Sequence, residues 1–146
     1  MPSIWGTSPR QSVAAECARR GKPALVAGCI AMLEANDFDE ELALALGGPA
    51  ANQVLAGREG GRDGYWPRVW AARALLYVWD GAAEPAVVHA TTDTSWRVRE
   101  MAAKVIGHHR LEGAFSAAVC LQDDPVARVS AAALRAIQSI SSSGSG

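Results

Sequence analysis

The segment from Trp96 to Gly107 constrains the fold most, because its pattern of residue types returns at a fixed interval of 31 residues on both sides. Toward the C-terminus, each apolar residue falls on another apolar residue: Val98, Ala102, Ala103, Val105 and Ile106 become Val129, Ala133, Leu134, Ala136 and Ile137. Toward the N-terminus, the last four become Ala71, Ala72, Ala74 and Leu75. Three copies in register indicate an internal repeat, and repeats of this kind stack into a solenoid.

Small apolar residues make such a stack possible. The chain of 146 residues is 49% hydrophobic but only 6% aromatic, and alanine is its commonest residue. Alanine is the strongest helix former, and its short side chain lets neighbouring helices approach closely. A chain of this length buries about 70% of its unfolded surface, which is enough for a core without disulfides or metals.

Helical spacing of apolar residues and the capping residues predict an all-α fold. No segment alternates with period 2, so we expect no strands. The expected helices cover about residues 9–20, 23–35, 36–47, 49–56, 65–79, 83–91, 95–107, 113–121 and 125–140.

One domain is expected over residues 1–140, with regular repeats at 64–138 and atypical capping helices at 8–57. Glycines 57, 60, 61 and 64 predict a flexible loop between these parts. Residues 141–146, rich in serine and glycine, are expected to form a disordered tail.

The pattern of Asp93, Val98-Arg99, Ala102-Ala103 and Val105-Ile106-Gly107 resembles the short HEAT-like repeats first named in phycobilisome lyases. The resemblance implies a right-handed α-solenoid of stacked antiparallel helix pairs, with about nine helices in roughly four repeats plus an N-terminal helix. It implies that the Val-Arg helix of each pair lines the concave side. It also implies that Asp93 and Arg99 bond between loops, in a ladder that Ser130 and Pro67 interrupt.

The exposed face of helix 95–107 suggests where a partner would bind. Steps of 100° put Arg97, Glu100 and Lys104 opposite the core stripe. Carried by the repeat interval, these positions form three rows: Trp66, Arg97, Arg128; Val69, Glu100, Ala131; and Arg73, Lys104, Arg135. With the flanking residues, the predicted groove consists of Trp66, Trp70, Arg73, Tyr77, Arg97, Glu100, Lys104, His108, Arg128 and Arg135.

Each of these residue types also has a purely structural interpretation. Large aromatic residues such as Trp66 and Trp70 fill space between helices that carry alanine, and arginines on a helix face are often only solvated. Trp, Tyr and Arg are nevertheless enriched at binding hot spots. Trp66 and Arg73 are therefore the first choice for a recognition surface.

Nothing in the sequence indicates catalysis, a metal or a cofactor. No nucleophile, phosphate-binding or metalloprotease motif is present. His89, His108 and His109 have no cysteine or carboxylate at ligand spacing. The three cysteines, Cys17, Cys29 and Cys120, lack a CxxC pair, which indicates buried thiols in a reducing compartment. The N-terminus does not resemble a secretory signal, so we expect a cytoplasmic protein.

Four functions remain open at this point, the last of them self-assembly of the chain through an exposed end of the stack. The favoured one is a non-catalytic binding or scaffold module whose concave groove holds a partner protein or peptide. The second is nucleic-acid binding, as in HEAT-like DNA glycosylases, although a net charge of −1 counts against it. The third is a lyase-like protein that handles a small molecule or chromophore.

Overall fold

The structure is a computed structural model that describes residues 8–37, 40–48, 51–56 and 64–143. Within these ranges every regular element is helical and no strand is present. The chain divides into two compact units, Met1–Asp80 (unit 1) and Gly81–Gly146 (unit 2), which are described separately below. No helix of the described ranges is both long and apolar enough to cross a membrane.

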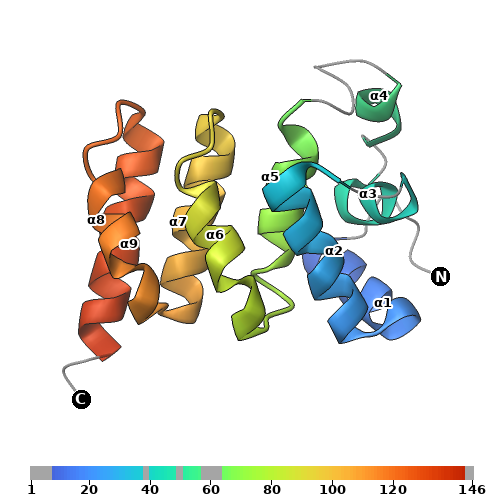
Figure 1. Cartoon of the computed structure of the whole chain (residues 1–146), viewed down its shortest axis with the longest axis horizontal. Coiled ribbons are helices and arrows are strands. Elements are labelled where there is room, and N and C mark those ends of the chain that lie inside the picture. Colours follow the sequence, from blue (N-terminus) through green and yellow to red (C-terminus); the bar gives the residue numbers. More distant parts are fainter. Residues whose placement is uncertain (1–7, 38–39, 49–50, 57–63, 144–146) are drawn as a thin grey trace. The chain divides into compact units, whose positions relative to one another are not determined.

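Unit 1 contains α1 (Pro9–Arg20), α2 (Lys22–Ala35), α3 (Glu40–Gly47), α4 (Ala51–Leu55) and α5 (Trp66–Ala74), coloured blue to green in Figure 1. The first helix begins at a capping box, in which the Ser8 hydroxyl accepts from the Gln11 amide and the Gln11 side chain accepts from the Ser8 amide. Gly21, with φ of 87°, ends α1 and directly precedes α2.

Close approach at two glycines sets the packing of unit 1. A Cβ atom at Gly28 in α2 would lie 2.6 Å from Cδ2 of Leu42, and one at Gly47 would lie 2.8 Å from the Trp70 indole. The indole of Trp70 therefore packs directly on the end of α3, and Leu25, Cys29 and other residues of α2 complete a fully buried core.

An ion-pair network links α1 to α3. Arg19 donates to both carboxylate oxygens of the buried Glu16, at 2.8 and 2.9 Å, and Arg20 donates to the same carboxylate at 2.7 Å. Arg19 also contacts Glu41 of α3 at 2.6 Å. The hydrogen bonds from Arg19 and Arg20 hold the pKa of Glu16 below its usual value despite burial.

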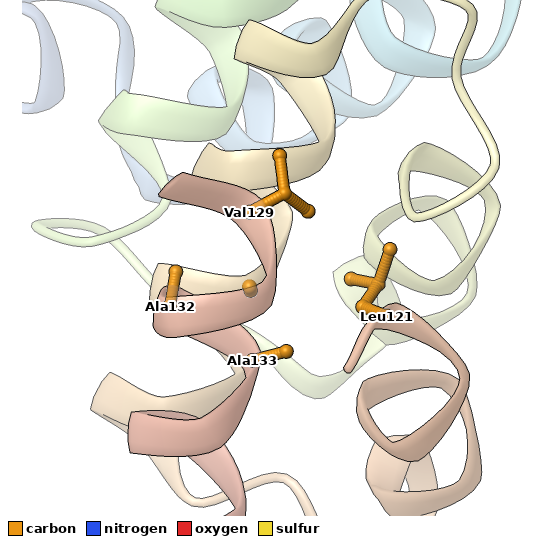
Figure 2. Packing of buried hydrophobic residues seen from close by; sticks show 5 residues of the cluster. Leu121, Val129, Ala132 and Ala133 are labelled. Carbon is orange, nitrogen blue, oxygen red and sulfur yellow. The ribbon is translucent and has the colours of Figure 1, made fainter. Parts of the chain in front are cut away.

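Unit 2 contains α6 (Glu84–Ala90), α7 (Trp96–His109), α8 (Phe115–Leu121) and α9 (Ala127–Ser143). Short 3-10 turns at Gly81–Ala83 and Glu112–Ala114 precede α6 and α8. Helix α6 packs on α7 and helix α8 packs on α9, while α7 and α9 lie side by side. Figure 2 shows Val129, Ala132 and Ala133 of α9 with Leu121 of α8 in the hydrophobic cluster that also contains Ala103.

The two long helices of unit 2 run parallel and touch closely. Arg128, near the start of α9, contacts Glu100 near the start of α7. At the other end, the Ser139 hydroxyl donates to the Gly107 carbonyl at 2.9 Å. A Cβ atom at Gly107 would lie 2.9 Å from the Cα atom of Ala136, so glycine is what allows this separation.

Several helix boundaries differ from the predictions. The fifth helix ends at Ala74 rather than near residue 79, because the chain tightens into i→i+3 bonds, with the Leu76 amide donating to Arg73 and the Tyr77 amide to Ala74. The seventh continues through His109 to a left-handed Arg110.

The predicted tail is corrected at its start, because α9 continues through Ser143. Serine is only moderately unfavourable in a helix, and the sequence from Ala127 to Ser143 contains no glycine that would end the helix earlier. Residues 144–146, Pro49 and the glycines at 57, 60 and 61 lie outside the described residues. The single-domain boundary and the capping role of residues 8–57 stay predictions.

Candidate binding surface

Trp96 is the first residue of α7 and lies at the centre of a group of charged side chains. Its indole is half-buried and packs against the hydrophobic cluster of α8 and α9. The Arg97 guanidinium carbon lies over the ring at 4.5 Å from its centroid, and that of Arg128 at 5.3 Å. Cation–π attraction of this kind favours the positions of both guanidinium groups beside the ring.

Glu100 lies one turn further along α7 and is covered by cations. The Glu100 side chain is only 9% exposed, and its Oε2 accepts a 3.0 Å bond from Nε of Arg128. The Lys104 ammonium is 4.0 Å from the same oxygen. The sequence predicted an exposed Glu100, and this is corrected: the carboxylate is buried because the side chain of Arg128 reaches across from α9.

Two further cations lie two turns along the same helices. Lys104 follows Arg97 by seven residues in α7, and Arg135 follows Arg128 by seven residues in α9. The side chains of Arg128 and Lys104 are 67% and 41% exposed, and Arg135 is also exposed. We call this surface the α7–α9 face and define it as Trp96, Arg97, Glu100, Lys104, Arg128 and Arg135.

Five of these six residues belong to the groove predicted from the sequence, and Trp96 does not. A signal was available, since Trp96 opens the central repeat segment and directly precedes Arg97. Helix periodicity alone did not predict which side of the helix the Trp96 ring covers, because Trp96 is the first residue of α7 and no helical turn precedes it. His108, another predicted residue, is exposed near the end of α7 and lies against His109, with ring centroids 4.8 Å apart.

The remaining predicted residues belong to unit 1, and most serve its packing. Trp70 is only 4% exposed and is a core residue, which corrects its assignment to a groove. The Arg73 guanidinium is half-buried and donates to the Leu46 carbonyl at 2.8 Å, so it connects α5 to α3. Burial lowers the pKa of Arg73.

Tyr77 and Trp66 keep some exposed surface. Tyr77 is 38% exposed, and the Arg10 guanidinium carbon lies 5.4 Å from the centroid of its ring. Trp66 is half-buried beside Tyr65, with ring centroids 5.1 Å apart. The rows that would join Trp66 and Arg73 to the cations of unit 2 stay a prediction.

Arg99 connects two loops of unit 2, but through a different carboxylate from the one singled out in the sequence. Its guanidinium forms two bonds to Asp124, at 2.7 and 3.2 Å, and a third to the main-chain oxygen of Asp93 at 2.9 Å. Asp124 follows Asp93 by the repeat interval of 31 residues, which was the signal that could have found it. These bonds from Arg99 hold the pKa of Asp124 below its usual value.

Both aspartates have the same local role. The Asp93 carboxylate accepts from the Ser95 amide at 2.9 Å, and the Asp124 carboxylate accepts from the Val126 amide at 2.9 Å. Each therefore shapes the loop that leads into a long helix. The Asp124 side chain also receives the guanidinium of Arg99.

In the described part of the chain, no three His, Cys, Asp or Glu side chains lie close enough together to hold a metal ion. Burial raises the pKa of the Cys29 thiol to about 12, and Cys17 is half-buried. Cys120 is exposed, which corrects the expectation of three buried thiols. The neighbouring Ala118 and Leu121 face the core, so helical geometry turns Cys120 outward.

Comparison with known proteins identifies the class. The family model for HEAT repeats matches residues 63–138, just over half of the chain. The chain therefore belongs to the HEAT repeat family, and the predicted all-α, solenoid-type fold class is confirmed. Neither the curated proteins nor the solved structures gave a match.

Proposed function

We propose that this chain is a non-catalytic protein-binding module that holds a segment of a partner protein on the α7–α9 face. HEAT repeats generally serve as scaffolds for protein interaction, and the matched region includes the whole face. The observation that carries the proposal is Trp96 with the Arg97 and Arg128 guanidinium groups over its ring.

This arrangement has the properties of an interaction hot spot. Tryptophan and arginine dominate the binding energy of protein interfaces, especially where they are held rigidly before the partner arrives. Packing against the hydrophobic cluster holds Trp96, and the bond to Glu100 holds Arg128. Little side-chain entropy is then lost on binding, which favours affinity.

Site-specific photo-crosslinking in native extract tests the proposal. A benzophenone amino acid replaces Lys104 or Arg135 on the face, or Glu112, which is exposed beyond the far end of α7. We expect one partner protein to crosslink from positions 104 and 135 but not from 112. The purified partner should then bind the unmodified protein and bind a Trp96→Ala variant at least about tenfold more weakly.

Circular dichroism of the Trp96→Ala variant controls for folding, because the ring also packs on the core. An unchanged helix content with unchanged partner affinity would overturn the proposal. Equal crosslinking from positions 104 and 112 would overturn it as well, because the contact would then not belong to this face.

A further inference from the structure

The charge and spacing of the α7–α9 face identify the chemistry of its partner. We infer that the face binds an acidic helical segment of a partner protein, whose carboxylates recur about every 10 Å along one side. This inference rests on the proposed function, since it names what the same face would hold.

The α7–α9 face is rich in positive charge. The face carries four cations, Arg97, Lys104, Arg128 and Arg135, and a single carboxylate, Glu100. Glu100 is buried and already bonded to Arg128, and the equivalent position in α9 is Ala131, which adds no negative charge. The surface is therefore locally basic on a chain whose net charge is −1.

Arg128 bonds within the face through only one of its nitrogens in the described part of the chain. Its Nε atom donates to Glu100 at 3.0 Å, while the side chain as a whole is 67% exposed. Its two terminal nitrogens are the part of the group that can reach a partner. A guanidinium fixed over an aromatic ring presents a planar edge that suits a carboxylate.

The cations of the α7–α9 face have a regular spacing along the two helices. Because α7 and α9 run parallel and side by side, the repeat interval gives two pairs of equivalent positions on neighbouring helices: Arg97 with Arg128, and Lys104 with Arg135. Seven residues separate the pairs along each helix, which corresponds to about 10.5 Å. Acidic residues at positions i and i+7 of a partner helix lie on one side at the same separation.

The α7–α9 face suits a protein segment better than a single-stranded nucleic acid. Single-stranded nucleic acids bind largely by stacking bases on aromatic rings. The ring of Trp96 already has two guanidinium groups over it, so it offers a poor stacking platform.

Defined probes test the inference with the full chain. The acidic probe is a fluorescent alanine-based helical peptide with glutamates at i, i+7 and i+14, and its control replaces these with glutamine. A single-stranded oligothymidine of similar charge represents nucleic acid. The test variant is Lys104→Gln with Arg135→Gln, which removes the 4.0 Å contact of Lys104 with Glu100 but leaves Trp96 and the shorter Glu100–Arg128 bond in place. The matched control is Lys22→Gln with Arg110→Gln, an equal charge change at exposed positions outside the face.

We expect the acidic peptide to bind more tightly than the glutamine peptide and the oligothymidine. Loss of two exposed ion pairs in the test variant should weaken peptide binding about fivefold, while the control variant stays within about twofold. Equal binding to both double variants would overturn the inference, and so would tighter binding of oligothymidine than of peptide. If the partner crosslinks from the face but these peptides do not distinguish the variants, the binding function stands and the acidic chemistry is wrong.

Discussion

At the scale of single residues, the contact between Arg99 and Asp124 is the most informative in unit 2. The Asp124 side chain is 6% exposed and that of Arg99 is 16% exposed, so the pair is largely shielded from water and salt. Exposed ion pairs contribute little to stability, but removing one partner of a buried pair leaves an uncompensated charge. We therefore expect this contact, rather than the exposed cations, to limit the stability of unit 2.

The Asp124→Asn variant tests this expectation. The amide oxygen can still accept from the Val126 amide, so only the charge and one guanidinium bond are lost. We expect the free energy of unfolding to fall by about 2 kcal/mol, measured by urea denaturation. In a double-mutant cycle with Arg99→Met, the two losses should not add, and additive losses would contradict a direct interaction.

Acid stability gives a second test of the same pair. A carboxyl group with a lowered pKa in the folded state stabilises fully above its unfolded pKa, about 3.9, and this contribution is lost as the pH falls through the folded pKa. When the pH is lowered from about 5 to about 2.5, the free energy of unfolding should therefore fall less for the Asp124→Asn variant than for the unmodified protein. Glu16, whose pKa is lowered by its arginines, should preserve part of the acid sensitivity in the variant. Parallel pH curves would contradict the assignment.

At the scale of elements, the separation of α7 and α9 depends on Gly107. A Cβ atom there would meet the Ala136 Cα atom at 2.9 Å and its Cβ atom at 3.3 Å. Main-chain atoms cannot rotate away, so the helices would have to move apart. Such overpacking costs more than the helix propensity that alanine would add.

Gly107→Ala should lower the free energy of unfolding by about 1–3 kcal/mol. The matched control is Gly81→Ala, where the added Cβ would meet nothing within 4 Å. The control should change stability by less than about 0.5 kcal/mol. Thermal denaturation followed by circular dichroism measures both, and equal effects would contradict the close approach of α7 and α9.

The same scale shows what the sequence could predict. The repeat interval gave the fold class and the placement of Arg97, Lys104, Arg128 and Arg135 on corresponding positions of successive helices, because periodicity determines which residues share a face. It did not give the burial of Glu100, since that depends on an arginine from another helix. Nor did it give Trp70 as a core residue, because this depends on the absence of a side chain at Gly47.

At the scale of the whole molecule, the cysteines report on unfolding. Cys29 is 0% exposed with a pKa raised to about 12, whereas Cys120 is exposed. Single-cysteine variants should therefore differ in native-state alkylation, with Cys29 reacting at least about a thousandfold more slowly than Cys120. Mass spectrometry of the labelled protein measures both rates, and comparable rates would contradict the buried position of Cys29.

The prediction of one domain over residues 1–140 can be examined with the same label. In a single cooperative domain, urea exposes Cys29 at the midpoint at which helix content is lost. We expect the two midpoints to coincide. Separate midpoints would show that units 1 and 2 unfold independently.

The loop bond of Arg99 also bears on how such a protein could grow during evolution. A tandem duplication of one repeat would bring a copy of Arg99 into register with a copy of Asp124, because both belong to the same interval of 31 residues. The next position in that series is occupied by Ser130, whose hydroxyl donates to the Ala127 carbonyl of its own helix. A serine has no guanidinium group to reach a following loop, so the same bond one interval later would require an arginine at position 130.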